Sequence, residues 1–404
     1  MDFDLSDRSK ELVRRVTAFR DEYIYPNEKL FTDQVASEVD HWRPAPLLEE
    51  LRATAKQAGL WNLSAGDKYG PGLSNLEYAP IAEIMGCNEW APEVFNCNPP
   101  DSGNMDILAA YGNHEQKERW LKPLVEGEIR SCFAMTEANV ASSDASNIST
   151  RARIDADEWV IDGEKSWISG PGNPNCKLAI AMCCSDPAAE RHQRHSMILV
   201  PLNTPGLTIK RHLTVFGFDF APRGHFQLNF KNVRVPLANT LFAPGYGFEI
   251  AQRRLGPGRL HHAMRCIGAA ERALDLMCVR SLSRIAFGKP IADLGGTGDV
   301  IARSRIEINM LRQFGLWTAH LLDTVGPQST RSETSQLKVA APEMACRVVD
   351  RAIQIHGAAG VSQDTPLAAL YARLRTLRIA DGPDEVHLRV IAKQELAKYK
   401  TSKN

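Results

Sequence analysis

The sequence predicts a multidomain α+β fold, with an all-α N-terminal domain (1–130), a β-rich middle domain (131–245) and an all-α C-terminal domain (246–404). Three successive sequence patterns support this division: first helical periodicity, then short alternating runs between turn residues, and last long helical segments. The all-α, all-β, all-α order is unusual in one chain. A length of 404 residues also exceeds the usual limit of one hydrophobic core, so several packed regions and room for a large cofactor are expected.

The N-terminal domain is predicted to be helical because its apolar residues recur on one helix face. Leu12, Val16 and Phe19 follow this spacing, as do Leu47 and Leu51. Strand signals are absent from this part of the sequence. The region is therefore expected to consist of amphipathic helices up to about residue 128.

The middle domain is predicted to consist of strands. Apolar or alternating runs cover 178–184, 196–202 and 225–230, between clusters of Gly, Pro, Asn and Asp. The pair Asp162-Gly163 stands between two such runs and predicts a type I′ hairpin, because both residues tolerate positive φ.

The C-terminal domain is predicted to be an antiparallel helix bundle. Its helical segments cover 248–287, 299–324, 332–356 and a last stretch through 397. A Gly-Pro-Gly sequence at 256–258 is expected to interrupt the first of them.

Composition limits the classes of partner. The chain is 44% hydrophobic and 24% charged, as in an ordinary globular protein, and no apolar run is long enough to span a bilayer. Its 48 basic residues balance 48 acidic ones, which removes the overall charge that binding to nucleic acid or to an anionic membrane would need.

Cysteine usage and the chain ends predict a reducing compartment. The nine cysteines are scattered without C-x-x-C spacing and are expected to be reduced thiols. The first residues resemble neither a secretory signal nor a transit peptide, and 402–404 do not match the peroxisomal tripeptide. A cytoplasmic or organelle-matrix location is expected.

Two segments of the middle domain carry polar groups where strands end. Residues 131–144 read S-C-F-A-M-T-E-A-N-V-A-S-S-D. This segment is either a strand that leaves the sheet through a turn or a loop that offers hydrogen bonds to a flat heteroaromatic ring. Residues 165–170 read K-S-W-I-S-G, in which the tryptophan either fills a barrel or faces such a ring.

Three segments of the C-terminal domain have a structural and a functional interpretation. The sequence R-I-A-F-G-K-P at 284–290 is typical of a helix end. In Q-I-H-G-A-A-G at 354–360, small residues permit either a cap or close approach to a phosphate. In R-I-A-D-G-P-D-E-V-H at 378–387, Asp381 is either a helix N-cap or a functional carboxylate.

Taken together, in this order, these segments resemble the acyl-CoA dehydrogenase family over nearly the whole chain. The family patterns are T-E-P-x-x-G-S-D, K-x-W-I-T-N-G, R-x-x-F-G-x-P, Q-x-x-G-G-x-G and I-Y-E-G-T. The segment A-D-G-P-D-E-V-H-L resembles the subgroup called family members ten and eleven. The resemblance implies an N-terminal α-domain, a middle β-barrel and a C-terminal four-helix bundle.

The resemblance implies an FAD-dependent oxidoreductase of fatty acid metabolism that converts an acyl-CoA thioester to the 2-enoyl-CoA. Asp381 matches the position where many members carry a glutamate base, so it would take the α-proton while the β-hydride passes to flavin N5. Relatives that place the base before the pantetheine arginine have it where Gly258 stands here, and glycine accepts no proton. A desolvated carboxylate beside the ring would have a raised pKa.

The remaining roles implied by the resemblance concern binding. The flavin ring would contact Phe133, Met135, Thr136, Trp167 and Ser169; the substrate would contact Ser143, Arg259 and Gly382; the rest of FAD would contact Arg284, Phe287, Gln354, Gly357, Ala358, Pro383 and Glu385. The FAD is usually that of a neighbouring subunit, which implies a homotetramer built as a dimer of dimers. Electrons would leave to an electron-transfer flavoprotein or to O₂.

The sequence departs from the family pattern at several of these positions. Asp381 is one methylene shorter than glutamate, and a displacement of about 1 Å can cost roughly 10²-fold in rate. Gly295 stands where relatives often have a glutamine that contacts adenosine, and Pro383 and Glu385 replace the usual Thr and Gln. Ala138 replaces the usual proline in a loop that is one residue longer.

Three other interpretations stay open. Nitroalkane oxidases share this fold and use an aspartate base, although Ser143 and Arg259 favour the thioester. A non-catalytic or DNA-associated relative is disfavoured by the neutral charge. The third and weakest interpretation is a metal site at His192-x-x-His195. The arginines around this pair oppose the binding of a cation, so no metal is predicted. The pair 261–262 either lines the acyl pocket or packs.

Overall fold

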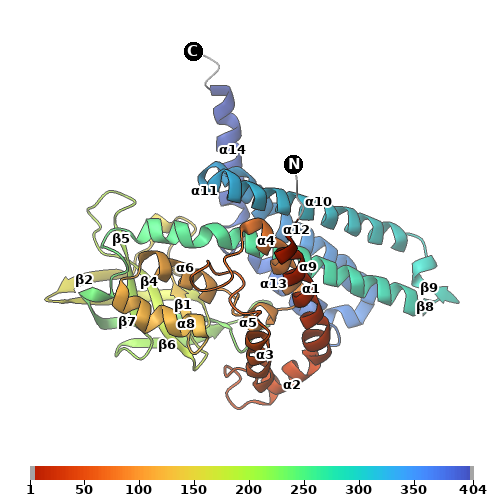
Figure 1. Ribbon diagram of the computed structural model, residues 1–404, viewed down its shortest axis with the longest axis horizontal. Helices are drawn as coiled ribbons and strands as arrows, with labels where there is room; N and C mark the ends of the chain where they lie inside the picture. Colours follow the sequence, from red (N-terminus) through yellow and green to blue (C-terminus); the bar gives the residue numbers. More distant parts are fainter. Residues whose placement is uncertain (1–4, 401–404) are drawn as a thin grey trace. The chain divides into compact units, whose positions relative to one another are not determined.

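The structure, a computed structural model, describes residues 5–400 (Figure 1). The chain divides into two compact units. The helical unit comprises residues up to 24, 73–92 and 257 onward, and the sheet unit comprises 25–72 and 93–256. The predicted boundaries of the three domains stay predictions. The tripeptide 402–404, which differs from the peroxisomal signal, lies outside the described residues. Within 5–400, no helix combines the length and the apolar character that crossing a membrane requires.

Helices precede the strands along the chain, as predicted. Those of the sheet unit are α2 (Glu28–Ser37), α3 (Pro46–Gln57), α6 (Asp101–Tyr111), α7 (His114–Gln116) and α8 (Lys122–Glu126), with the short α5 (Ala91–Val94) where the chain enters the unit. No strand occurs among residues 5–129 of the described chain, which confirms the prediction that this part of the chain is helical.

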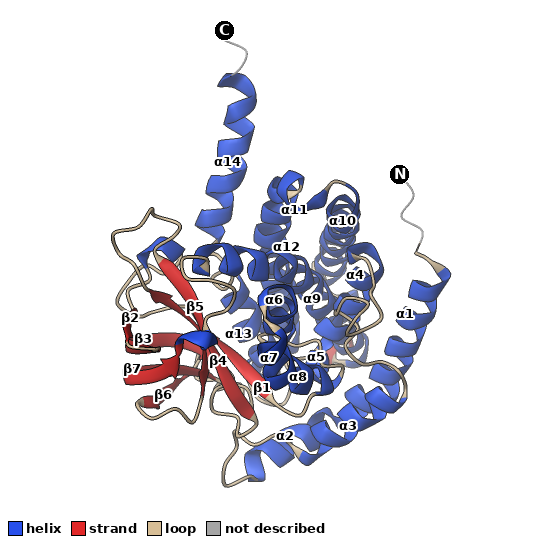
Figure 2. Ribbon diagram, turned by 60° about the vertical axis from the view of Figure 1, so that its left-hand side comes forward, coloured by secondary structure: helices blue, strands red, loops and turns tan. Residues whose placement is uncertain are grey.

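The sheet unit contains one curled seven-stranded sheet, drawn in red in Figure 2. Its strands are β1 (Arg130–Ala134), β2 (Arg151–Asp155), β3 (Glu158–Ser169), β4 (Cys176–Cys184), β5 (His195–Pro201), β6 (Leu207–Leu213) and β7 (His225–Pro236). The order is β1-β4-β2-β3-β7-β6, with β5 also paired to β4. Strand β1 runs parallel to β4, whereas β5 runs antiparallel to it.

Strand β4 is buried on both faces, which explains its continuous apolar sequence. Leu178, Ile180 and Met182 join a cluster that includes residues of α6 and α8. The alternate residues Ala179 and Ala181 join a second cluster with residues of β3 and β7. The core of the unit is therefore two apolar layers, one on each face of the sheet.

The predicted hairpin at Asp162-Gly163 is wrong. Strand β3 runs through both residues, and its pairing with β7 shifts register there. Gly163 has a φ of +151°, and a Cβ at this position would lie 2.7 Å from Thr150 Oγ1. The glycine serves a β-bulge and a close contact, while the actual turn between β2 and β3 is Ala156-Asp157.

The helical unit is built mainly from long helices. They are α1 (Asp7–Phe19), α4 (Asn75–Ile84), α9 (Gly247–Ser283, which enters this unit at 257), α10 (Thr297–Thr324), α11 (Gly326–Ser329), α12 (Arg331–His356), α13 (Leu367–Leu377) and α14 (Asp384–Lys400). Between α9 and α10 the chain forms the small hairpin β8 (Ile285–Ala286) and β9 (Lys289–Pro290).

Helices α10 and α12 are antiparallel neighbours. Glu307 forms ion pairs with Arg347 and Arg351, at 3.2 and 2.8 Å, and Arg351 also donates to Ser304 Oγ at 3.2 Å. This register places the C-terminal end of α12 beside the beginning of α10. The hairpin β8–β9 leads into α10 at the same end of the unit.

The predicted interruption at 256–258 does not occur, because α9 continues through it. The helix beyond it buries Leu260, Ala263, Met264 and Ile267 completely. This continuous buried stripe outweighs the weak helix propensity of the Gly-Pro-Gly sequence. This is the main local difference from the predicted bundle. The last helical stretch divides into α13 and α14 within 378–387, the segment expected to contain a helix start.

Candidate active site

The loop between α13 and α14 carries the predicted base. Its ends are joined, because Asp384 N–H donates to the Arg378 carbonyl at 3.1 Å and Arg378 Nε donates to Asp384 Oδ2 at 2.7 Å. Asp381 has a φ of +56° and Gly382 a φ of +101°. Among residues with a side chain, Asp and Asn tolerate positive φ best. The chain therefore turns sharply at Asp381 just before α14 begins.

Asp381 is held through both its side chain and its backbone. Its carboxylate Oδ2 lies 3.0 Å from His262 Nε2, and its side chain is 21% exposed. Its carbonyl accepts hydrogen bonds from Arg259 Nε at 3.4 Å and His387 Nε2 at 3.2 Å. Because a carbonyl only accepts, His387 carries its proton on Nε2, and its Nδ1 accepts from Ser335 Oγ at 3.3 Å.

A third helix fixes the same loop through a buried lysine. Lys338, on α12, donates from Nζ to the carbonyl of Leu377 and, at 3.5 Å, to that of Gly382. Gly382 is also needed for packing, because a Cβ there would lie 2.8 Å from His387 Nε2. Helices α9, α12 and α14 thus determine the backbone position of residues 381–382.

The surroundings of Asp381 are cationic and poorly hydrated. Burial lowers the pKa of Arg259 and of Lys338, whereas the charge of Asp381 acts in the opposite direction on both. Burial and the charge of Arg259 lower the pKa of His387 to about 4. Burial likewise lowers the pKa of His262, against the hydrogen bond and charge of Asp381. Both imidazoles are therefore neutral near pH 7.

The structure brings the predicted Arg259, Asp381 and Gly382 together. His387 and Lys338 belong to the site although the sequence analysis assigns them no role. His262 is one of the two histidines expected either to line the acyl pocket or to pack. Its neighbour His261 packs edge-on against Tyr78, with ring centroids 4.7 Å apart. The i, i+3 spacing of 259 and 262 on a helix was an available signal, because such residues share a face.

The residues predicted to contact the flavin ring gather where β1 and β3 end in the sheet unit. Thr136 Oγ1 donates to the Ser166 carbonyl, and Ser166 N–H donates to the Thr136 carbonyl at 2.8 Å. Trp167 has a φ of +60° and is 51% exposed, although Ser166 and Ile168 on either side are buried. Ser169 Oγ lies 3.0 Å from His225 Nδ1.

Three supporting residues of this group were not predicted. His225, whose pKa burial lowers to about 4, orients the Ser169 hydroxyl. The Arg254 guanidinium lies 4.0 Å from the ring centroid of Phe133, a cation–π contact. Buried Lys165 donates to the carbonyl of Met135 at 3.0 Å.

The other predicted residues lie outside these two groups. Ser143 is exposed in the loop after β1. Arg284 and Phe287 are exposed on the β8–β9 hairpin, where Phe287 has a φ of +52°. Gln354 lies in the last turn of α12, and Gly357 and Ala358 lie in the 3₁₀ segment that follows it. Pro383 stands just before α14, and Glu385 is in its first turn. By the register of α10 and α12, the hairpin and the end of α12 lie at one end of the helical unit.

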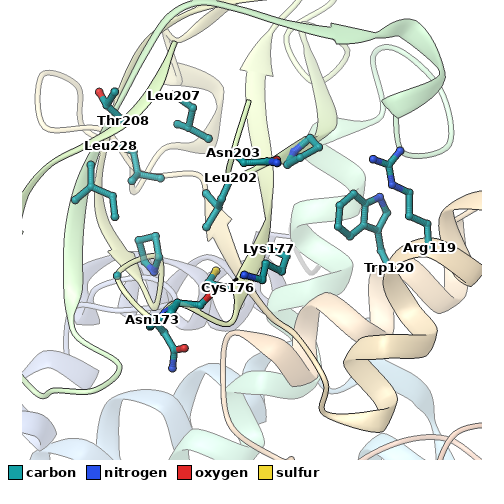
Figure 3. A pocket seen from close by; sticks show the side chains of 15 residues that line it. Arg119, Trp120, Asn173, Cys176, Lys177, Leu202, Asn203, Leu207, Thr208 and Leu228 are labelled. Carbon is teal, nitrogen blue, oxygen red and sulfur yellow. Dashed lines mark hydrogen bonds between the residues drawn. The ribbon is translucent and has the colours of Figure 1, made fainter. Parts of the chain in front are cut away.

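A cavity of about 520 Å³ opens elsewhere in the sheet unit (Figure 3). Its lining includes Trp120, Asn173, Lys177 and Thr208, and none of the predicted site residues. The cavity is therefore separate from the group around Trp167.

The two histidines considered as a metal pair have separate partners. His192 stacks on Phe248 with ring centroids 4.2 Å apart, and His195 Nε2 lies 2.9 Å from the Ile148 carbonyl. Among residues 5–400, no group of three or more His, Cys, Asp or Glu side chains is arranged to hold a metal ion.

Comparison with known proteins covers each part of the chain. The N-terminal, middle and C-terminal domain families of acyl-CoA dehydrogenases match residues 6–128, 132–233 and 245–396. Acyl-CoA dehydrogenase family member 10 of Mus musculus is 51% identical over 97% of this chain, and family member 11 of Homo sapiens 49% over 96%. This chain spans only 37% and 50% of those two proteins.

Other relatives match over their full length. Probable acyl-CoA dehydrogenase FadE2 of Mycobacterium tuberculosis is 49% identical, and the alignment covers 100% of this chain and 98% of that protein. The structure of a putative acyl-CoA dehydrogenase from Mycobacterium abscessus is 52% identical with a TM-score of 0.96, over 98% of this chain and 100% of that one. Butyryl-CoA dehydrogenase from Megasphaera elsdenii gives a TM-score of 0.83 at 25% identity, over 98% of this chain and 100% of that one. The protein thus belongs to the acyl-CoA dehydrogenase family.

Proposed function

We propose that the protein is an FAD-dependent acyl-CoA dehydrogenase that converts a saturated acyl-CoA thioester to the 2-enoyl-CoA, with Asp381 taking the α-proton. The observation that carries the proposal is the way Asp381 is held. Its carboxylate is partly exposed, its backbone is bound from α9 and α14, and its Oδ2 is 3.0 Å from His262. A general base needs this combination of access and fixed geometry.

The residues around Asp381 support removal of a proton from a weakly acidic carbon. The guanidinium of Arg259 and the ammonium of Lys338 provide positive potential where negative charge develops on the thioester oxygen. Arg259 also contacts the backbone of Asp381, so a shift of the arginine would displace the base. The backbone of Gly382, which Lys338 holds at 3.5 Å, would contact the substrate.

The group around Trp167 has the properties that a flat heteroaromatic cofactor needs. An indole that is half exposed between buried neighbours offers an aromatic face, and the hydroxyls of Thr136 and Ser169 lie nearby. Since the Thr136 hydroxyl donates to Ser166, its oxygen can accept a hydrogen bond from a ring N–H. We propose that these residues, with Phe133 and Met135, hold the isoalloxazine. Bound FAD would supply the acceptor for the β-hydride.

The hairpin β8–β9 supports the proposal that the nucleotide end of FAD is bound across subunits. Phe287 is 95% exposed and Ile285 58% exposed, and such apolar surface is typical of a face that a partner covers. We propose a homotetramer in which Arg284 and Phe287, with Gln354, Gly357 and Ala358, hold a neighbour's FAD, and Pro383 and Glu385 complete its site. Sedimentation velocity tests the assembly: a species of four chains is expected, and a monomer would refute it.

Anaerobic titration of the purified protein with a panel of acyl-CoAs tests the activity. Bleaching of the flavin by at least one acyl-CoA, with formation of the 2-enoyl-CoA, is the expected result. Production of H₂O₂ from nitroethane without bleaching by any acyl-CoA would instead assign a nitroalkane oxidase. Reoxidation by electron-transfer flavoprotein and by O₂, measured side by side, identifies the electron acceptor.

A further inference from the structure

We infer that His262 is a positioning residue that fixes the carboxylate of Asp381 in the orientation needed for proton removal. Four contacts define its setting: Oδ2 of Asp381 lies 3.0 Å from His262 Nε2, and three other donors hold the backbone of residues 381–382. The inference rests on the proposed function, because it concerns the base of that reaction.

The need for such a residue follows from the length of the base. An aspartate places its carboxylate one methylene closer to the backbone than a glutamate, so its reach depends on the backbone and on two side-chain torsions. Arg259, His387 and Lys338 hold backbone carbonyls of the loop. The His262 contact acts on the carboxylate itself, from α9, one helical turn after Arg259.

The protonation state of His262 determines what it does to Asp381. A neutral imidazole with its proton on Nε2 donates to the ionised carboxylate and stabilises that form. Burial lowers the pKa of His262, so a neutral imidazole is expected near pH 7. A donor 3.0 Å from the Asp381 carboxylate favours its ionised form, which is the form that can accept a proton.

The other charged groups packed around the pair favour the same state. Arg259 and Arg265 lie on α9, and Lys338 on α12; each carries positive charge that opposes protonation of the imidazoles beside Asp381. His387, on α14, contacts the Asp381 carbonyl and is neutral. Ionised Asp381 with neutral His262 is thus the state that these neighbours support.

Two substitutions separate a hydrogen-bonding role from a packing role. His262→Leu removes the donor while retaining bulk. His262→Gln restores an N–H the same number of bonds from Cβ and cannot titrate. His261→Leu is the matched control, since it removes an adjacent half-buried imidazole that packs on Tyr78.

The single-turnover rate of flavin reduction, measured from pH 5 to 9, is the first readout. We expect His262→Leu to lower the rate by about 10- to 100-fold, as misplacement of the base by about 1 Å would. In the same variant, the fall of the rate on the acidic side of the pH profile should occur at higher pH, because the ionised carboxylate loses a donor. The FAD content and the Kd of the acyl-CoA should be unchanged. His262→Gln should recover most of the rate, and His261→Leu should leave the acidic side of the pH profile unchanged.

The second readout is the ¹⁵N resonance of the His262 ring in the protein without substrate. A neutral Nε2–H form whose shift changes in Asp381→Asn is expected. Wild-type rate and pH profile in His262→Leu, or a folded His262→Gln that is as slow as His262→Leu, would overturn the inference. A wild-type protein that no acyl-CoA reduces would refute the proposed function instead, and the ¹⁵N shift would still decide whether the pair exists.

Discussion

Lys165 Nζ lies 2.8 Å from Glu137 Oε1, and both side chains are buried. The lysine also donates to the carbonyls of Met135 and Met182, at 3.0 and 2.6 Å. Backbone N–H groups of Ser149 and Thr150 donate to the Glu137 carboxylate at 2.8 Å each. The pair therefore ties the ends of β1 and β4 and the start of β2 to one position on β3.

Glu137→Gln is expected to destabilise the protein strongly, because it leaves the Lys165 charge buried without its partner. Breaking one side of a buried ion pair costs about 3–5 kcal/mol. Urea denaturation of the variant checks this. The control is Glu164→Gln on β3, which removes the more exposed ion pair of Glu164 with Lys210. Equal unfolding free energies for the two variants would contradict it.

The pair of Glu137 and Lys165 also predicts that the unfolding free energy falls in acid. Burial alone would raise the pKa of Glu137, but Lys165 and the hydrogen bonds from Ser149 and Thr150 lower it from 4.5 to about 2. Because the folded-state pKa lies below the unfolded value, the stabilisation is complete above about pH 4.5 and is lost as the pH falls towards 2. Unfolding free energies measured between pH 2 and 6 should show this loss, and Glu137→Gln should flatten it.

Gly163→Ala is expected to destabilise the sheet unit by more than about 1 kcal/mol, since the residue has a positive φ that alanine disfavours. A new Cβ would also lie 2.7 Å from Thr150 Oγ1. Gly298→Ala is the control, because a Cβ added there would have no neighbour within 4 Å and the residue is in the first turn of α10. Thermal unfolding of both variants tests the difference, and an unchanged Tm in Gly163→Ala would contradict the requirement for glycine at this position.

Trp167→Ala is expected to reduce FAD retention with little change in the stability of the protein without FAD. The indole is half exposed, so its removal costs little packing, whereas a bound ring would lose its aromatic contact. Phe216→Ala is a close control, because Phe216 is 69% exposed and also has a positive φ, of +51°. Flavin content after gel filtration should fall only in Trp167→Ala.

Local periodicity was sufficient to predict the order of helices and strands, but turns depended on tertiary contacts. Asp162-Gly163 has the composition of a hairpin turn, yet β7 pairs with β3 across it, and the glycine is there because Thr150 packs against it. The Gly-Pro-Gly sequence resembles a break, but the buried stripe of α9 continues past it. Where a segment belongs to a long buried helix or strand, tertiary packing overrides its local propensity for a turn.

The predicted site residues depended on motifs, and their supporting residues had no such signal. Asp381, Gly382 and Arg259 were identifiable because they stand in recognisable segments. Lys338 precedes Gly382 by 44 positions, and His225 follows Ser169 by 56, so only folding brings each pair together. A lone lysine in an amphipathic helix gives no indication that its ammonium will be buried against a loop.

Single-turnover flavin reduction by Asp381→Asn tests the role of this residue as the base most directly, because asparagine keeps the shape of the side chain and cannot take a proton. We predict that the variant binds FAD and the acyl-CoA as the wild type does and that its flavin stays oxidised. The exposed Asp364→Asn should react normally. Flavin reduction by Asp381→Asn at the wild-type rate would contradict the assignment of Asp381 as the base.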